Sequence, residues 1–346
     1  MNLCNEMEEC AGCYELDSKL NVGSDLLFSC CAVTDNYNYQ YDSPPGIYWA
    51  DNDWDMERTI SAYFKMREKL SDSIKKGEAC RCTGCGQITH CSRPFQKKIK
   101  EIAFALSDPC QLSCIYCRQK NAVNPDYINA KADIKRDRFT QTFDYKHFLE
   151  ILEQRRLLSD DVLIVMASGE ITINPRIDEI LDAVQNYRLV FFTNAVTYND
   201  RIAALTARPG SSQLISVDAG TRETYKSIKG MDAFGKVWAN IKEYIDNGSN
   251  TIIKYVVIKD NCNKSNMEGF INELLIAGVK EFRISANYFR EAPYTHEEMK
   301  LMAKLISMAE CNGIKVQFEA TFKHEEQTAI MLNLQKETYN IVPDLK

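Results

Sequence analysis

Residues 105–121 read ALSDPCQLSCIYCRQKN and place Cys110, Cys114 and Cys117 in the spacing C-x3-C-x2-C. The apolar run Ile102 to Leu106 overlaps the start of this stretch and predicts a strand, so the cysteines lie in the loop that leaves it. A cubane has four irons, and a complete protein set would be four thiolates. A compact set of three therefore predicts an iron–sulfur cluster with one iron left open for an exogenous ligand.

Downstream of Ile99, short apolar runs alternate with amphipathic stretches, which is typical of repeated βα units and a parallel sheet. We expect an α/β fold in which six such units close most of a barrel. The expected strands are Ile102 to Leu106, Val162 to Met166, Leu189 to Thr193, Leu214 to Val217, Ile252 to Ile258 and Glu281 to Ser285, with a seventh at Ile314 to Phe318. The expected helices are Met56 to Ile74, Tyr145 to Leu157, Ile177 to Val184, Phe234 to Tyr244, Met267 to Ala277 and His296 to Met308.

Polar side chains follow the next three strands at their carboxyl ends. Glu170 follows the second strand in VMASGEITINP, Thr193 and Asn194 end the third, and Ser216 and Asp218 end the fourth. In barrels of this type the chemistry sits at these ends, so hydrogen bonds to a ribose or a substrate are one interpretation. Simple capping of turns by Asn and Asp is the other.

The cysteine triplet, with the aromatic Tyr116 before its last cysteine, resembles the signature of the radical S-adenosylmethionine (SAM) superfamily. Ser168-Gly169-Glu170 is similar to the family's GGE motif, with Ser in place of the first glycine. The resemblance implies a TIM-like partial (β/α)6 barrel in which the three cysteines hold a [4Fe–4S] cluster. It also implies that the open iron binds the amino and carboxylate groups of SAM, while the GGE carboxylate holds the ammonium.

The same resemblance implies the reaction class. Electron transfer into the sulfonium would break a C–S bond and give a 5′-deoxyadenosyl radical, which takes a hydrogen atom from a peptide, protein or small metabolite. The outcome would be oxidation, crosslinking or epimerisation, and the electron would come from a donor such as flavodoxin or ferredoxin. The alternative from another class is a non-catalytic iron–sulfur or zinc protein that serves electron transfer or assembly.

A second cysteine constellation lies upstream, in CAGCYELDSKLNVGSDLLFSCC (10–31) and GEACRCTGCGQITHC (77–91). Its C-x2-C-x5-C core resembles the SPASM domain, which holds auxiliary iron–sulfur clusters. We therefore expect a cysteine-rich domain over 1–97, the partial barrel over 98–325 and a helical tail over 326–346. The same thiolates would also build a structural zinc site. The candidate ligands, of which a subset is needed, are Cys10, Cys13, Cys30, Cys31, Cys80, Cys82, Cys85 and Cys91.

Cys262 follows the fifth strand, where a thiol could return a hydrogen atom to a substrate radical. The alternative is an ordinary loop cysteine. Lys254 and Tyr255 on the fifth strand and Arg283 and Ser285 on the sixth alternate with apolar neighbours. The sequence leaves open which face of the sheet each of them occupies.

The composition excludes several classes of protein. The fourteen cysteines stand in tight clusters within a long chain of 346 residues, which favours metal ligation over a disulfide scaffold. A net charge of −6 makes nucleic acid an improbable partner. No apolar run reaches the roughly 18 residues of a membrane span, and the first residues lack a secretion signal, so we expect a cytoplasmic protein.

Overall fold

The structure, a computed structural model, describes residues 11–29, 46–80, 82, 88–90, 98–106, 109–117, 134–167, 169–287, 290, 292–319 and 333–335. The chain forms two compact units. Unit 1 comprises Met1–Ser107, Ala130–Ser168 and Asp178–Arg188, and unit 2 comprises Asp108–Asn129, Gly169–Ile177 and Leu189–Lys346. The predicted domain boundaries at residues 97 and 325 stay predictions.

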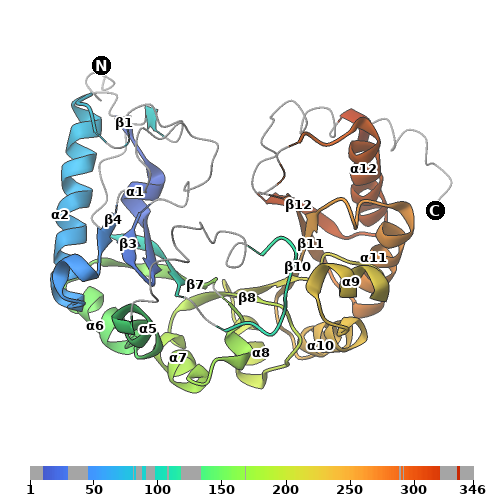
Figure 1. Ribbon diagram of the computed structural model, residues 1–346, viewed down its shortest axis with the longest axis horizontal. Helices are drawn as coiled ribbons and strands as arrows, with labels where there is room; N and C mark the ends of the chain where they lie inside the picture. Colours follow the sequence, from blue (N-terminus) through green and yellow to red (C-terminus); the bar gives the residue numbers. More distant parts are fainter. Residues whose placement is uncertain are drawn as a thin grey trace, which may run out of the picture. The chain divides into compact units, whose positions relative to one another are not determined.

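Unit 1 contains a mixed sheet with its helices (Figure 1). Its strands are β1 (Ala11–Gly12), β2 (Lys19–Gly23), β3 (Leu26–Phe28), β4 (Gly46–Tyr48), β5 (Thr89–His90), β6 (Ile99–Ala105) and β7 (Leu158–Met166). Its helices are α1 (Tyr14–Ser18), η1 (Ala50–Asn52), α2 (Met56–Lys75), α5 (Ile134–Gln141), α6 (Tyr145–Gln154) and α7 (Ile177–Val184). The strand order is β7-β6-β2-β3-β4, with β7, β6 and β2 parallel and the last two antiparallel. β1 and β5 form a separate antiparallel pair.

Strands β6 and β7 confirm two of the predicted strands, but no pattern in the sequence predicted β2, β3 and β4. Strands β3 and β4 have three residues each, too few for alternation to be recognised, and β2 (KLNVG) contains a buried Asn21 and ends in glycine. Helix α6 ends at Gln154, earlier than expected, because Arg156 adopts a left-handed φ of 56°. The chain is thereby free to enter β7 at Leu158, also earlier than expected.

Helix α2 confirms the predicted helix almost residue for residue. The side chain of Asp55 caps its first turn by accepting from Arg58 N. The fully buried Arg67 donates from Nε to the Leu16 carbonyl at 2.8 Å and from an Nη to the Asp17 carbonyl at 2.7 Å. These bonds tie α2 to α1, beside which it lies in Figure 1.

Unit 2 alternates parallel strands with helices. Its strands are β8 (Arg188–Thr193), β9 (Ser212–Ser216), β10 (Thr251–Val257), β11 (Glu281–Ala286) and β12 (Lys315–Glu319), neighbours in that order. Its helices are η2 (Ile171–Ile173), α8 (Asp200–Thr206), α9 (Arg222–Lys229), α10 (Phe234–Asp246), α11 (Lys264–Ala277) and α12 (His296–Cys311). Every strand predicted from periodicity is present, and the predicted α/β class with successive βα units is confirmed.

One face of the unit 2 sheet is covered by helices. The ring of Tyr255 on β10 lies 4.6 Å from that of Phe270 on α11, which in turn lies 5.6 Å from Phe282 on β11. Figure 1 shows α9, α10, α11 and α12 gathered around β10, β11 and β12. Among the described residues, no helix has the length and apolar character needed to cross a bilayer.

The loop after β9 approaches α11 so closely that only glycine fits. A Cβ on Gly220 would lie 2.0 Å from both Asn266 O and Phe270 N. The Gly220 amide also donates to Asn266 Oδ1 at 2.7 Å. This contact fixes the carboxyl end of β9, where Asp218 lies, against the helix layer.

We predict that Gly220→Ala lowers the free energy of unfolding by about 3 kcal/mol, because backbone atoms on two elements must separate. The matched control is Gly235→Ala on α10, where an added Cβ meets nothing within 4 Å. That change is expected to be neutral or to stabilise the helix by up to about 1 kcal/mol. Urea unfolding measures both, and equal midpoints for the two variants contradict the prediction.

Candidate functional site

The cysteine loop after β6 is held by the carboxyl end of α9. The amides of Ser113 and Ile115 donate to the carbonyls of Lys229 and Ile228 at 2.9 and 3.0 Å. The last carbonyls of a helix have no intrahelical partner, so they are available for such bonds. Gly230, at φ 70°, ends α9 and lies against Ser113 so closely that an added Cβ would meet the Ser113 Cβ at 2.9 Å. The loop therefore takes its conformation from α9.

A buried charge cluster stands beside this loop. The side chains of Lys229 and Asp218 are 1% and 0% exposed and form an ion pair. Lys229 Nζ also donates to the hydroxyl of Tyr116 at 2.7 Å, and that hydroxyl donates to Asp218 Oδ2. The other carboxylate oxygen, Asp218 Oδ1, accepts from Val256 N at 2.5 Å. A buried ion pair is tolerated when its remaining hydrogen-bonding capacity is satisfied in this way.

The backbone of Asp218 is strained, and its neighbours hold it in place. Its φ of 60° is left-handed, which is uncommon for a residue other than glycine. The Asn261 Nδ2 donates to the Asp218 carbonyl at 2.8 Å and to the Val256 carbonyl at 2.7 Å. Burial and the negative charge of Asp218 hold the pKa of Tyr116 well above its usual value. The phenol therefore keeps its proton and donates it to the carboxylate.

The three cysteines lie within this short loop and differ in exposure. Cys110 is exposed, whereas Cys114 and Cys117 are half-buried. Burial raises the pKa of the Cys114 thiol, and the charge of Lys229 acts in the opposite direction. Among the described residues, no three Cys, His, Asp or Glu side chains converge on a single metal ion. A cubane takes each thiolate on a different iron, so three thiols spread over one loop fit such a cluster.

Glu170 anchors the other end of the loop. Its amide donates to the Pro109 carbonyl at 2.9 Å. Its buried carboxylate accepts from the hydroxyls of Thr172 and Thr193, both at 2.7 Å, and from the amide of Asn194 at 2.6 Å. Burial raises the pKa of Glu170, and these donors lower it. The carboxylate thus joins the turn after β7, the end of β8 and the start of the cysteine loop.

The side chain of Asn194 extends this network to the first cysteine. Its Nδ2 donates to Cys110 Sγ at 3.7 Å and to Gln111 Oε1 at 3.3 Å. Sequence analysis predicted Asn194 as a site residue and missed Gln111, whose position inside the triplet carries no signal of its own. The neighbouring Gly169 has a φ of 57°, and Ser168 lies outside the described residues.

Ser216 and Cys262 are not part of these hydrogen-bond networks. Ser216, half-buried, ends β9 beside Lys254 of β10. Cys262 donates from Sγ to the Glu298 carbonyl on the first turn of α12 at 3.8 Å. Burial and the charge of Glu298 raise the pKa of its thiol to about 12. The Cys262 thiol is therefore protonated at neutral pH. Its sulfur faces the first turn of α12.

Three of the N-terminal cysteines lie in or against one small apolar cluster. Cys13 is buried with Leu16, Leu70 and Ile74, and the half-buried Cys80 and Cys82 pack against this cluster. Cys10, Cys30, Cys31, Cys85 and Cys91 lie outside the described residues.

Lys229 belongs to the site, although no feature of the sequence predicts it. In TRETYKSIKG it stands in a charged amphipathic stretch and looks like any solvent-exposed lysine. Helix α9 ends there with a left-handed Gly230, and this turn directs the side chain toward Asp218 rather than toward water. Only the ion pair that Lys229 forms with Asp218 in the folded chain shows that this lysine belongs to the site.

A family model matches the part of the chain that carries the cysteine triplet. The model of the Radical SAM superfamily matches residues 105–274. The "Probable GTP 3′,8-cyclase" of Saccharolobus islandicus strain Y.N.15.51 is 25% identical over 194 residues, which are 55% of this chain and 58% of that protein. The same-named protein of strain M.14.25 is 24% identical over 193 residues. The chain thus spans little more than half the length of these relatives.

Two solved structures have a partly similar fold. SuiB of Streptococcus suis, bound to its precursor peptide SuiA, has a TM-score of 0.48 and 13% identity, covering 90% of this chain and 73% of that one. The anSMEcpe structure with bound AdoMet and the Cp18Cys peptide has a TM-score of 0.44 and 16% identity, covering 63% and 62%.

The buried ion pair predicts a large effect on stability. Lys229→Met leaves the Asp218 carboxylate buried and uncompensated, which is expected to cost about 4 kcal/mol of unfolding free energy. Adding Asp218→Asn to that variant removes the stranded charge and should restore most of the loss. The control Lys242→Met breaks an exposed pair with Asp246 and should cost no more than about 0.5 kcal/mol. Urea unfolding of the four proteins tests this; a small loss in Lys229→Met alone contradicts it.

Proposed function

Because the chain belongs to the radical SAM superfamily, whose members are enzymes, we propose that it cleaves SAM reductively and abstracts a hydrogen atom from a peptide, protein or small metabolite. The observation that carries the proposal is the anchored loop with Cys110, Cys114 and Cys117. It lies inside the residues that match the family model. Oxidation, crosslinking and epimerisation are the outcomes open to such an enzyme.

Family membership implies a [4Fe–4S] cluster and SAM. A bound cluster with an open iron supplies one electron to the sulfonium of SAM, which yields methionine and a 5′-deoxyadenosyl radical. We propose Cys110, Cys114 and Cys117 as its three thiolate ligands. Their loop is fixed at one end by Glu170 and at the other by Lys229, so the ligands are positioned before the cofactor binds.

The residues around the loop divide into two kinds. Thr193 and Asp218 use their side-chain oxygens within the protein, so we propose that they position the loop and the strand ends. Asn194 and Ser216 are better placed to contact SAM or the substrate, because Asn194 already reaches Cys110 and Ser216 makes no network bond. Contact of the Glu170 carboxylate with the methionyl ammonium of SAM stays a prediction of the family resemblance.

For the substrate class we propose a small metabolite. The curated relatives are named as enzymes that act on GTP, which supports this choice. An identity of 25% over 55% of the chain does not carry the assignment to GTP itself. We further propose a cytoplasmic protein that takes its electron from a donor such as flavodoxin or ferredoxin.

We propose that the N-terminal cysteines hold an auxiliary iron–sulfur cluster. The proposal is supported by the close spacing of these cysteines in the sequence, and Cys13, Cys80 and Cys82 lie in or against one apolar cluster. Zinc bound by the same thiolates is the alternative. Counting iron, sulfide and zinc in the purified chain separates the two, because an auxiliary cubane raises iron and sulfide beyond the content of one cluster.

The central test is anaerobic reconstitution followed by dithionite and SAM. We expect the wild-type chain to form 5′-deoxyadenosine, and Cys110→Ala, Cys114→Ala and Cys117→Ala each to lose it by at least about a hundredfold, because each removes a ligand. Cys311→Ala, an exposed cysteine on α12, is the control and should keep full activity. A wild-type chain with a filled cluster and no 5′-deoxyadenosine supports the non-catalytic alternative.

The hydrogen-donor role of Cys262 has its own test. A hydrogen-atom donor must hold an S–H bond at neutral pH, and the raised pKa of about 12 meets that condition. If Cys262 is the donor, Cys262→Ala stops the conversion of the substrate radical to product, while 5′-deoxyadenosine still forms. Mass spectrometry of the substrate in deuterated buffer follows the returned hydrogen. Unaltered product from the variant rejects the role.

A further inference from the structure

The hydroxyl of Tyr225 is a buried donor that has no partner in the described part of the chain. Tyr225 lies on α9 and is fully buried. Its Oη makes no hydrogen bond to any of the described residues. A buried hydroxyl that stays unsatisfied costs free energy, and most such groups in folded proteins find an acceptor. The Tyr225 hydroxyl therefore indicates an acceptor that a bound group supplies.

Helix α9 carries this side chain on the same face as Lys229. Residues four apart share one face of a helix, so Tyr225 and Lys229 lie on the same side of α9. The Lys229 ammonium on that side pairs with Asp218. The last turn of the helix also supplies the two carbonyls that hold the cysteine loop. The ring of Phe234 lies 6.0 Å from the Tyr225 ring, so packing fixes the phenol beside the loop.

The phenol of Tyr225 lies close to negative groups of the site. Burial raises its pKa, and the negative charges of four groups raise it further, those of Cys114, Asp218, Glu170 and Cys110. A charge shifts a pKa strongly only over a short distance, so these groups lie near the phenol. The phenol keeps its proton at neutral pH and is available as a donor.

Neither of the two nearby carboxylates accepts this proton. The Asp218 carboxylate accepts from the Lys229 ammonium and the Val256 amide. The Glu170 carboxylate accepts from the turn that follows it and from the end of β8. The other two groups near the Tyr225 hydroxyl are the sulfurs of Cys110 and Cys114. An iron–sulfur cubane adds inorganic sulfides to such thiolates, so it brings the acceptor that the hydroxyl lacks.

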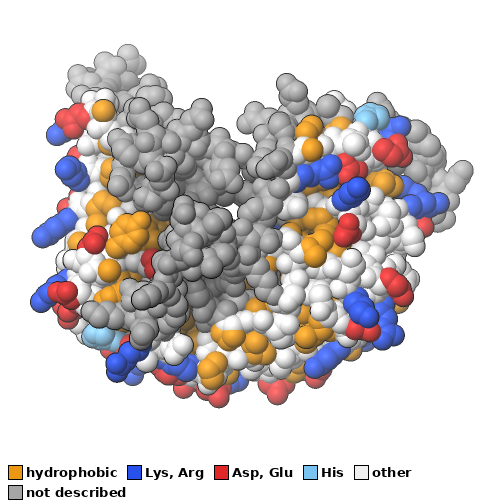
Figure 2. All heavy atoms as spheres, viewed as in Figure 1, with side chains coloured by type: hydrophobic (Ala, Val, Ile, Leu, Met, Phe, Trp, Pro, Cys, Tyr) orange, Lys and Arg blue, Asp and Glu red, His pale blue; other side chains and the backbone are white. Residues whose placement is uncertain are grey.

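The surroundings of the phenol strengthen such a bond. On the face shown in Figure 2, Lys and Arg side chains are interspersed with Asp and Glu, where water solvates them. Glu170 and Asp218, in contrast, have no exposure at all. A hydrogen bond to a charged acceptor is electrostatically stronger in a buried environment than in water.

We propose that Tyr225 donates a hydrogen bond to a sulfur of the cluster that Cys110, Cys114 and Cys117 hold. This inference rests on the proposed function and adds to it a residue that tunes the cluster. Hydrogen bonds to sulfur are among the factors that set the reduction potential of an iron–sulfur cluster. A donor stabilises the reduced form, which is the more negative one, so Tyr225 makes the cluster easier to reduce.

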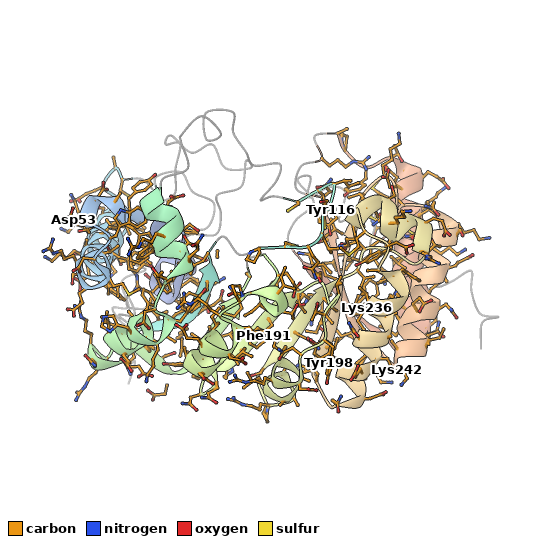
Figure 3. The ribbon with its side chains drawn as sticks, turned by 60° about the horizontal axis from the view of Figure 1, so that its bottom comes forward. Asp53, Tyr116, Phe191, Tyr198, Lys236 and Lys242 are labelled. Atoms are coloured by element: carbon orange, nitrogen blue, oxygen red, sulfur yellow. The ribbon has the colours of Figure 1, made fainter. Side chains whose placement is uncertain are left out.

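The first test is a stepwise reduction of the reconstituted holoenzyme, followed by electron paramagnetic resonance. The signal that Cys114→Ala abolishes belongs to this cluster and not to an N-terminal one. Tyr225→Phe keeps the ring and removes only the hydroxyl, so we expect a more negative midpoint potential. The matched control is Tyr198→Phe, which should keep the wild-type potential. The Tyr198 hydroxyl accepts from Asn247, and Figure 3 shows this residue apart from Tyr116.

A second measurement detects the proton itself. Electron–nuclear double resonance of the reduced wild-type enzyme without SAM should show an exchangeable proton coupled to the cluster. This coupling should disappear in deuterated buffer and in Tyr225→Phe, and it should remain in Tyr198→Phe. An unchanged potential together with an unchanged set of couplings in Tyr225→Phe overturns the inference. A coupling that appears only after SAM is added assigns the phenol to SAM and overturns it as well.

The proposed function and this inference fail in different ways. Formation of 5′-deoxyadenosine by the wild-type chain tests the function. If it fails while Tyr225→Phe still lowers the potential, the chain is a non-catalytic iron–sulfur protein and the hydrogen bond stands. If the wild-type chain forms 5′-deoxyadenosine and Tyr225→Phe leaves both cluster measurements unchanged, only the inference is wrong. A chain that holds no cluster on the triplet overturns both.

Discussion

The buried contact between Lys229 and Asp218 is the interaction on which the candidate site depends. A lysine and an aspartate with almost no exposure would destabilise the fold unless each found its partners, and here they do so through Tyr116 and Val256 N. The position of Lys229 at the end of α9 also presents two free helix carbonyls to the cysteine loop. One helix terminus therefore fixes both the charge beside the thiols and the path of the backbone that carries them.

The loop needs such external supports because residues 109–117 form neither helix nor strand. Its first residues are held through Glu170, whose carboxylate gathers donors from Thr172, Thr193 and Asn194. Its later residues are held by α9. A loop fixed at two points loses little further conformational entropy when a cofactor binds, which is the physical advantage of preorganisation. The same bonds explain why polar residues at strand ends are buried here instead of facing water.

The two faces of the unit 2 sheet differ in the polar residues that they carry. One is apolar and packs on the helices through Tyr255, Phe270 and Phe282, which supplies the burial that holds the strands in register. The other carries Ser216, Lys254, Arg283 and Gln317 in register, beside buried apolar residues such as Leu214 and Val256.

The sequence by itself determined the α/β class, every strand from β6 to β12 and the cysteine triplet, because periodicity and close spacing are local properties of the chain. It also placed Glu170, Asn194 and Asp218 at strand ends. The tertiary structure alone decided that Lys229 is buried, that Gln111 joins Asn194, and that Lys254 and Arg283 lie on the sheet face opposite α11. Each of these depends on contacts between residues distant in the chain, and three-residue strands such as β3 and β4 leave no pattern long enough to recognise. A lysine in a charged helix has the same local signature whether it meets water or a buried carboxylate, so only the fold distinguishes the two.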